Sequence, residues 1–409
     1  MPIALFILGL TIFGLGTTEF MIAGLLPELA ESFDVTVPQA GHLISLFAIG
    51  VTVGAPLITM LASRVPRKAT LVTLLVVFLA GELVAATAQS YGVLMAARLI
   101  TAVAHGAFFG IGAVVAASLV EPAKRARAIA IMFGGLTIAT IAGAPLGAFL
   151  GQHFGWRAPF WAVFAIGAVG LLGVITLIPH QPREEGANLR AELAAFRRVN
   201  VWLALATTLL SQAALFAAYT YVTPLLTDIT GFGEGAVPLL LTLFGVGTFC
   251  GSWLGGKFAD RNLMRTLWTG MILLGGMLLL FQVSAHNKIA MVVTLAAFGI
   301  ASFLINPGLQ TRVMNEAGEA PSLASAGNIS AFNIGNAVGP WAAGLAITGG
   351  HGYLAPAWVG VAFAAAALVA ALASTARDAS ARRTAGAAGP ASAPAPAEAA
   401  VAAAPAGRQ

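Results

Sequence analysis

The chain of 409 residues is divided into long apolar runs, each of which is long enough to cross a lipid bilayer. A spanning helix needs about 20 mostly apolar residues, because the hydrocarbon core of a bilayer is about 30 Å thick. The sequence therefore predicts an all-α integral membrane protein with twelve transmembrane helices. The predicted helices lie at about 2–26, 40–62, 69–88, 91–118, 126–151, 157–179, 200–226, 236–257, 266–285, 288–311, 320–348 and 354–376.

The composition fits a bilayer better than water as the solvent. The chain is 58% hydrophobic and 9% charged, with a formal net charge of +5, whereas about 25% of the residues of a soluble domain are charged. Its lysines and arginines form short clusters rather than a continuous basic face, so we expect no nucleic-acid partner. The single cysteine, Cys250, excludes an intramolecular disulfide framework and a CxxC zinc or redox motif. We expect neither a metal nor a cofactor.

The distribution of positive charge predicts the orientation of the chain. Cytoplasmic loops of membrane proteins carry an excess of lysine and arginine. If the N-terminus is cytoplasmic, most of the 21 lysines and arginines lie in cytoplasmic connections or in the C-terminal tail. Both termini are therefore predicted to be cytoplasmic.

Two of the apolar runs resemble each other at an offset of 197 residues. The stretches are "FAIGVTVGAPLITMLASR" (47–64) and "FGVGTFCGSWLGGKFADR" (244–261). The same offset places Pro27 on Pro224, but it places Glu19 on Phe216. An internal duplication therefore explains the scaffold but not the acidic residue. The matching positions are Phe47, Gly50, Gly54, Ala62 and Arg64 in the first stretch and Phe244, Gly247, Gly251, Ala259 and Arg261 in the second.

This duplication predicts two parallel halves that face each other across a central pathway, which is a transporter architecture. Residues 1–179 would form an N-terminal six-helix bundle, and residues 200–376 a pseudo-symmetric C-terminal one. The polar segment 180–199 would be a cytoplasmic linker. The Ala/Pro-rich segment 377–409 has almost no large side chains, so we expect a disordered cytoplasmic tail.

The loop after the second apolar run, "LASRVPRKATL" (61–71), resembles the basic loop signature of the major facilitator superfamily. Thr59, Ser63 and Pro66 depart from that signature. The stretch "LMAARLITAVAHGAFFG" resembles the family helix that carries a buried arginine, here Arg98. The stretch "GGLTIATIAGAPLGAFLG" resembles the glycine- and proline-rich helix of exporters.

Three further stretches resemble one branch of this family, the proton-driven efflux permeases, which include bacterial sugar exporters and chloramphenicol-resistance proteins. They are "GTTEFMIAGLLPELA", "YTYVTPLLTDITGFGEGAVPLLLTLFGVG" and "APLITMLASRVPRK". The resemblance covers about residues 1–376. It implies a monomer in the bacterial inner membrane that exports small molecules, such as sugars or amphiphilic drugs, in exchange for protons. An uptake permease or facilitator without proton exchange is the alternative in the same fold. An enzyme is not expected, since no HExxH, GxSxG or phosphate-binding loop occurs in a credible context.

Three ionisable residues are predicted to lie at one level inside the membrane: Glu19, Glu82 and Arg98. A charge in the membrane interior costs about 2.5 to 3.5 kcal/mol on insertion scales, so an unpaired one is poorly tolerated. A buried carboxyl group beside an arginine can exchange a proton, and these residues are the candidates for proton coupling. The alternative is a fixed Glu19–Arg98 pair that only holds two helices together.

A second group of residues lies near the middle of the predicted helices and could line the substrate pathway. Small-molecule sites combine apolar walls with a few placed polar groups. The alternative is packing and interhelical hydrogen bonding, which is common for Asn and Gln in membranes. The candidates are His105, Phe108, Phe109, Gln212, Phe216, Tyr219, Asn333 and Asn336.

A third group has mechanical interpretations. Glycine and proline allow close helix approach and bending, which suits two halves that rock around a central site. The basic loops could latch a cytoplasmic gate, although they could equally serve only as orientation signals. The candidates are Gly143, Pro145, Gly147, Gly339 and Pro340 in the helices, and Arg64, Arg67, Lys68, Asp260 and Arg261 in the loops.

Overall fold

The computed structural model describes residues 1–62, 65–121, 124–179, 196–318 and 321–387, and over these residues it is helical with no β-strand. Ten helices in this part of the chain are long and apolar enough to cross a membrane. Arg64, most of the predicted linker and residues 388–409 of the predicted tail lie outside the described residues.

The first half of the chain forms six helical passages that pack together, with α1 against α5, α6 and α7 and with α4 between α2 and α3. The fifth passage contains one turn of π-helix, which ends two residues before Pro145. The elements are α1 (Ile3–Phe33), α2 (Val37–Ala62), α3 (Arg67–Ala86), α4 (Tyr91–Ser118), α5 (Arg125–Ile138), η2 (Ala139–Gly143), α6 (Ala144–Phe154) and α7 (Ala158–Leu177).

The second half repeats this pattern, with α9 packed between α14 and α15 and with α11 along α12. The 48-residue α11 is two helices in series, because Asn262 has non-helical backbone angles (φ −157°, ψ 95°). Its side chain accepts a hydrogen bond from the backbone N–H of Arg265 (3.0 Å) and so starts the next helix. The elements are α9 (Val199–Thr220), α10 (Val222–Pro224), η3 (Leu225–Ile229), η4 (Glu234–Ala236), α11 (Val237–Ser284), α12 (Lys288–Leu304), α13 (Asn306–Ala317), α14 (Pro321–Ala346), η5 (Ile347–His351) and α15 (Ala355–Ala387).

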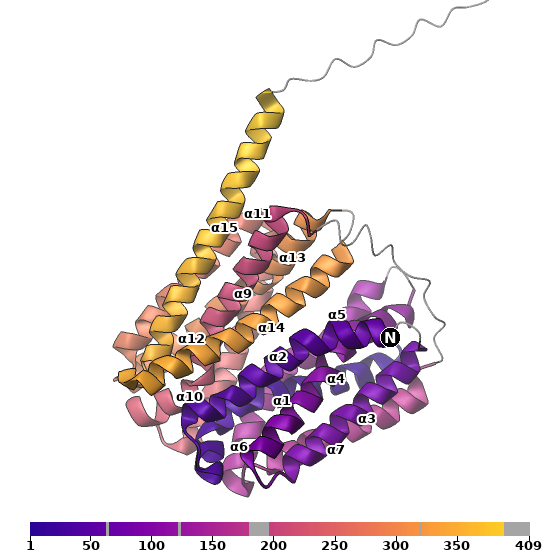
Figure 1. Cartoon of the computed structure of the whole chain (residues 1–409), viewed down its shortest axis with the longest axis vertical. Helices are drawn as coiled ribbons and strands as arrows, with labels where there is room; N and C mark the ends of the chain where they lie inside the picture. Colours follow the sequence, from indigo (N-terminus) through magenta and orange to yellow (C-terminus); the bar gives the residue numbers. More distant parts are fainter. Residues whose placement is uncertain (63–64, 122–123, 180–195, 319–320, 388–409) are drawn as a thin grey trace, which may run out of the picture.

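Two helices continue beyond their predicted ends. The first ends at Phe33 rather than near residue 26. The next residue, Asp34, adopts the left-handed conformation (φ 52°) and so ends the helix. The last extends to Ala387, so residues 377–387 are helical rather than disordered, and in Figure 1 this segment projects from the bundle. Its alanine-rich composition favours a helix once packing has fixed the preceding turns.

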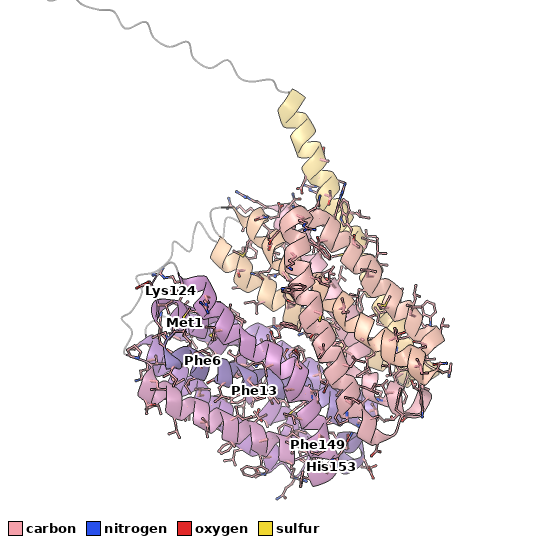
Figure 2. The ribbon with its side chains drawn as sticks, turned by 180° about the vertical axis from the view of Figure 1, so that it is seen from behind. Met1, Phe6, Phe13, Lys124, Phe149 and His153 are labelled. Carbon is pink, nitrogen blue, oxygen red and sulfur yellow. The ribbon has the colours of Figure 1, made fainter. Side chains whose placement is uncertain are left out.

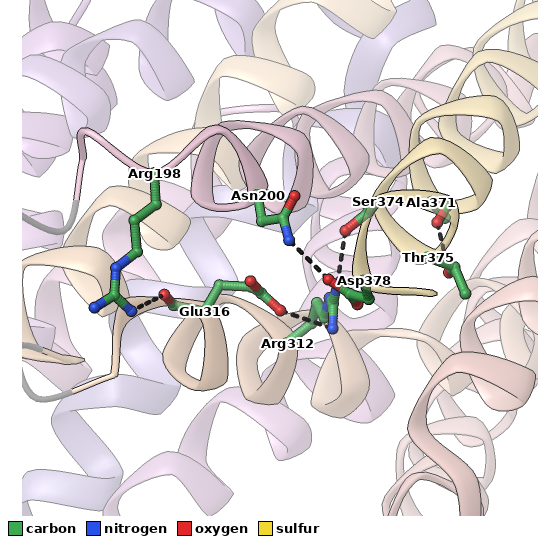
Figure 3. A network of polar contacts seen from close by, with 8 residues as sticks. All are labelled: Arg198, Asn200, Arg312, Glu316, Ala371, Ser374, Thr375 and Asp378. Carbon is green, nitrogen blue, oxygen red and sulfur yellow. Dashed lines mark hydrogen bonds and ion pairs between the residues drawn. The ribbon is translucent and has the colours of Figure 1, made fainter. Parts of the chain in front are cut away.

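A network of polar contacts fixes the C-terminal part of α15 to the bundle (Figure 3). Arg312 of α13 pairs with Asp378 of α15 (2.5 Å) and with Glu316 one turn along its own helix (2.8 Å). Asn200 of α9 donates a second hydrogen bond to Asp378 (2.7 Å). Three helices of the second half are thus joined at one end by charged and amide side chains. Sequence reasoning placed Asp378 in a disordered tail and therefore missed it.

The two ends of the bundle differ in their charge. Figure 2 shows Met1 and Lys124 at one end of the first half and Phe149 and His153 at the other. We call the first the basic end, because the described helix termini that carry Arg67, Lys68, Lys124 and Arg125 lie there. The other is called the turn end, because short turns such as 34–36 join the helices there.

The two halves contact each other from the middle of the bundle to the turn end, through α2 with α14, α1 with α10, and η2 and α6 with α11. In Figure 1 their ribbons diverge toward the side where the N-terminus lies, which is the basic end. There Leu57 and Leu61 of α2 are exposed. Between described residues, the hydrogen bonds across the interface run from Ser45 Oγ to Ala337 O (2.9 Å), from Thr223 Oγ1 to Ala23 O (2.9 Å), from Gln152 Nε2 to Glu234 O (3.0 Å) and from Thr248 Oγ1 to Thr140 Oγ1 (3.4 Å).

One contact between the halves is made by backbone against backbone. Gly245 of α11 lies on the π-helical turn η2, where a Cβ atom at position 245 would be 2.3 Å from the carbonyl oxygen of Thr140 and 2.6 Å from Cα of Ile141. Only glycine fits at such a distance. The main chain of the π-helical turn therefore packs directly against the second half, and the hydroxyl group of Thr140 also contacts that of Thr248 on α11 (3.4 Å).

The offset of 197 residues recurs in the helix packing. Each half contains a helix pair whose close approach depends on two glycines four residues apart, as expected where small residues let backbones come together in a membrane. Sequence reasoning identified the glycines but not their partners. In α2 and α4 the contacts are Gly50 with Ala102 and Gly54 with Val103, and in α11 and α12 they are Gly247 with Gly299 and Gly251 with Ile300.

We expect Gly251→Ala to destabilise the protein, because the added Cβ atom would lie 2.2 Å from the backbone oxygen of Ile300. Overpacking of this kind costs about 1–3 kcal/mol. Gly256→Ala on the same helix is the matched control, since a Cβ atom there meets nothing within 4 Å. Thermal unfolding in detergent should show a lower midpoint for Gly251→Ala only. Equal midpoints for the two variants would contradict the packing described.

Candidate functional site

The most deeply buried charged residues lie where α1, α3 and α4 meet. Glu82 of α3 is fully buried, and Arg98 of α4 is 1% exposed. Thr18 of α1, also fully buried, lies between them. The prediction that Glu82 and Arg98 lie at one level is confirmed, because the same threonine side chain contacts both of them.

Thr18 links the two charges through defined hydrogen bonds. Nη1 of Arg98 donates to the backbone oxygen of Thr18 (2.8 Å) and to its hydroxyl oxygen (3.0 Å). The hydroxyl group in turn donates to Oε1 of Glu82 (2.8 Å). The polar chain therefore runs from the guanidinium through one hydroxyl group to the carboxylate. Sequence reasoning missed Thr18, although a polar residue directly before Glu19 was a signal for it.

The remaining surface of the guanidinium is covered by an aromatic ring. Cζ of Arg98 lies 4.1 Å from the ring centre of Phe47 on α2, which is a cation–π contact. The Nε and Nη2 atoms of Arg98, and Oε2 of Glu82, have no hydrogen-bond partner among the described residues. The cluster therefore holds its charges with part of its hydrogen-bonding capacity unused.

Glu19 does not pair with Arg98, so the predicted pair is not formed in this structure. Its Oε2 atom instead lies 3.4 Å from Nε2 of His105, which is two turns further along α4. Consecutive residues of a helix point about 100° apart, so Thr18 faces Glu82 and Arg98 while Glu19 faces His105. The Glu19 side chain is 15% exposed, whereas that of His105 is 6% exposed.

His105 lies between two aromatic rings. It stacks on Phe109 (ring centres 4.7 Å apart) and meets the edge of Phe47 (5.2 Å). Phe47 thus contacts both Arg98 and His105. Phe108, by contrast, is fully buried in the apolar core.

The predicted aromatic residues of α9 join the two halves next to Glu19. Phe20 of α1 stacks on Phe216 (6.2 Å) and meets Tyr219 edge-on (6.4 Å). Tyr219 stacks in turn on Phe244 of α11 (4.7 Å). These four rings, of Phe20, Phe216, Tyr219 and Phe244, form what we call the aromatic wall, and it starts at the residue after Glu19.

The amide side chains of the second half are mostly bonded to one another. Gln212 donates to Oδ1 of Asn306 (2.9 Å), and Asn333 donates to the backbone of its own helix (2.9 Å). Asn336 differs, because its Oδ1 atom is buried without a partner among the described residues. A chain that sequence reasoning did not assemble runs from Ser325 through Gln310 and Asn328 to Thr208.

The predicted glycines and prolines lie at close helix contacts. Gly143 and Gly147 face Thr17 and Met21 of α1, and Gly339 faces the backbone of Ala213 on α9. Pro145 follows the π-helical turn η2. The carbonyl oxygen of Pro340 accepts the hydroxyl group of Tyr221 (3.1 Å).

The predicted loop residues occupy the basic end. Lys68 donates to the backbone oxygen of Ile175, near the C-terminus of α7 (2.6 Å), where a cation is favourable. Arg67 also has a partner. Asp260 and Arg261 are exposed, and Arg64 is not among the described residues.

Within the described ranges, no group of three or more His, Cys, Asp or Glu residues is placed to hold a metal ion. The polar groups of the site are the carboxyl group of Glu19, the imidazole ring of His105 and the amide group of Asn336, and the aromatic wall provides an apolar surface. A few placed polar groups beside apolar walls are typical of small-molecule sites.

A family model described as Major Facilitator Superfamily matches residues 8–340. The chain belongs to the major facilitator superfamily. Its members are transporters rather than enzymes, and the resemblance seen in the basic loop and in the Arg98 helix is thereby confirmed.

Among curated relatives, the chain is 44% identical over 341 residues to the inner membrane transport protein YdhP of Escherichia coli O157:H7, covering 83% of this chain and 88% of that protein. It is 38% identical over 378 residues to a chloramphenicol resistance protein of Streptomyces lividans, covering 91% of this chain and 96% of that protein. The relatives thus match nearly the full length of the helical region.

Among solved structures, the fold matches a bacterial homolog of the human lysosomal transporter Spinster in an inward-facing, occupied conformation. The TM-score is 0.72 at 17% identity, with 90% of this chain and 96% of that chain covered. The human organic anion transporter MFSD10 matches with a TM-score of 0.65 at 19% identity, covering 90% and 98%. These likenesses show the fold.

We expect Asn328→Ala to destabilise the second half, because it removes the partner of both Thr208 and Gln310 in a buried chain. A buried polar group left unsatisfied costs about 1–3 kcal/mol. Asn333→Ala is the control on the same helix, since Asn333 bonds only to the backbone of Ile329. The midpoint of thermal unfolding in detergent should fall further for Asn328→Ala. The reverse order would show that the chain contributes little to stability.

Proposed function

We propose that this chain exports small molecules across the bacterial inner membrane in exchange for protons. In this proposal the chain crosses the membrane twelve times, with both termini in the cytoplasm. Residues 1–179 and 200–376 form two six-helix bundles that rock about a central site. The substrates are sugars and their derivatives or amphiphilic drugs such as phenicols. The transporter acts as a monomer and needs no cofactor.

The observation that carries the proposal is the partly exposed pair Glu19–His105 beside the buried Arg98, Thr18 and Glu82. Charges in the membrane interior are expensive and commonly mark proton or ion pathways. In the described residues of the second half, the middle of the helices carries only neutral polar groups such as Gln212 and Asn336. One half therefore supplies the proton site, and both halves supply the substrate surface.

The geometry suggests how proton and substrate could be coupled. Glu19 is adjacent in sequence to Phe20, whose ring contacts Phe216 and Tyr219 of the second half. A substrate that enters against this aromatic wall would come within reach of the Glu19–His105 pair. Proton loss from Glu19 and substrate binding would then alter the same contact between the halves.

The conformation supports the direction of opening. Contacts between the halves extend from the middle to the turn end, and the apolar residues of α2 at the basic end are exposed. If the basic end is cytoplasmic, as the distribution of lysine and arginine predicts, the structure represents an inward-facing state. Substrate would then enter the site from the cytoplasm.

The relatives support export and an inner-membrane location. One is named an inner membrane transport protein and another a chloramphenicol resistance protein. Resistance by a transporter requires removal of the drug from the cell. A facilitator or uptake permease without proton exchange is the alternative. Such a protein would have no need of buried carboxyl groups, whose burial in the membrane costs free energy.

The test uses purified protein in proteoliposomes with a pH-sensitive dye inside. A panel of sugars, nucleosides and phenicols is added to the outside. We expect at least one compound to drive proton movement, and Glu19→Gln to reduce this movement about tenfold or more because it removes the proton-carrying group. Glu31→Gln is the matched control, since Glu31 is an exposed residue of the same helix.

Two outcomes would contradict the assignment. Proton movement that is the same in Glu19→Gln and in the wild type would exclude Glu19 as the coupling residue. Substrate movement without any proton movement, and insensitive to a pH gradient, would favour the facilitator.

A further inference from the structure

Thr18 occupies a position at which it can decide which acid Arg98 pairs with. We propose that its hydroxyl group is a positioning element that holds Arg98 on Glu82 and thereby leaves Glu19 free to exchange its proton. This inference deepens the proposed proton coupling and rests on it for its physiological meaning. Its structural content can be tested without any substrate.

The direction of the hydrogen bonds gives the hydroxyl group a specific role. A hydroxyl group has one hydrogen to donate, and that of Thr18 is donated to Oε1 of Glu82 (2.8 Å). Its oxygen simultaneously accepts from Nη1 of Arg98 (3.0 Å). Valine has nearly the same shape but can do neither, whereas serine can do both. The hydrogen bonds of residue 18 can therefore be removed with little change in the volume of its side chain.

Arg98 has the capacity for a second partner. Its Nε and Nη2 atoms are buried and have no hydrogen-bond partner among the described residues. Glu19 and Glu82 both act on it electrostatically. If the bridge through Thr18 is removed, the guanidinium loses its link to Glu82, and Glu19 is the other carboxylate within its influence.

Among the described residues, no further charged group competes for the guanidinium. The titratable and charged groups that face the cluster are Glu19 of α1, Glu82 of α3, His105 of α4 and Tyr219 of α9. The fourth neighbouring helix, α2, contributes the ring of Phe47. Arg98 can therefore pair with either of two carboxylates. One is Glu82, to which Thr18 donates a hydrogen bond, and the other is Glu19, which follows Thr18 in the sequence.

Two arrangements follow from this choice. In the structure, Arg98 is bound at Thr18 with Glu82, and Glu19 pairs with His105 alone. In the other arrangement, Arg98 pairs with Glu19 and stabilises its ionised form, so that Glu19 takes up a proton less readily. Thr18 favours the first arrangement and so keeps Glu19 open to protonation.

The experiment measures the reaction of each carboxyl group with dicyclohexylcarbodiimide, which modifies protonated carboxyl groups in apolar surroundings. Full-length protein in detergent is labelled at one fixed pH, and mass spectrometry follows the peptides that contain Glu19 and Glu82 separately. The variants are Thr18→Val and Thr18→Ser. Thr11→Val is the matched control, because the Thr11 hydroxyl group bonds only to the backbone of its own helix (2.9 Å). Glu19→Gln identifies the labelled site.

We expect Thr18→Val to slow labelling of Glu19 by about tenfold, because pairing with Arg98 stabilises the ionised carboxylate, which the reagent does not modify. Labelling of Glu82 should become faster in the same sample, because Glu82 loses both the hydroxyl donor and its link to Arg98. Thr18→Ser and Thr11→Val should stay within about twofold of the wild type. Opposite changes at two sites in one protein cannot result from general loosening of the fold.

Several results would overturn the proposal. These are an unchanged rate at Glu19 in Thr18→Val, a change in the same direction at both acids, or a Thr18→Ser variant that behaves like Thr18→Val. If Thr18→Val does not fold, Glu82→Gln decides instead, because it removes the carboxylate that competes with Glu19 for Arg98 and should slow labelling of Glu19. An unchanged Glu19 rate there refutes the proposal. Failure to find substrate-driven proton movement would refute the proposed function but would leave these rates as they are.

Discussion

The arrangement of the first half depends on the stabilisation of one guanidinium group inside the membrane. Arg98 is almost fully buried, and water cannot solvate it there. The backbone and hydroxyl oxygens of Thr18 and the ring of Phe47 replace part of that solvent, and Glu82 joins them through the Thr18 hydroxyl group. Because these groups come from α1, α2 and α3, satisfying the charge fixes three helices around α4.

The helical frame is duplicated, but this charge cluster is not. The glycine contacts of α2 with α4 recur in α11 with α12 at the same offset of 197 residues. At that offset Glu19, Glu82 and Arg98 correspond to Phe216, Leu279 and Leu295. Packing in a membrane relies on small residues, so the frame can be copied without its charges. The second half instead has amides and aromatic rings in its interior.

The sequence alone predicted the helical class from hydropathy and the repeat from a constant offset. It predicted the shared level of the buried charges from their positions in the helices and from the free energy cost of an unpaired charge in the membrane. It did not predict the partners. A fixed pair of Glu19 and Arg98 was one of two interpretations. Because consecutive residues point about 100° apart on a helix, Arg98 contacts Thr18 and Glu19 contacts His105 instead. Helix ends were also misplaced, since Asp378 was assigned to a tail although it anchors α15 through Arg312. The roles of the predicted site residues remain predictions.

The contact between Gly245 and the π-helical turn at Thr140 has a mechanical consequence. Side chains at an interface can adjust by changing rotamer, but two main chains in direct contact cannot. Any movement of the halves at this point must therefore either keep the two backbones together or separate them completely. A contact with only these two options favours two discrete conformations over a continuous range.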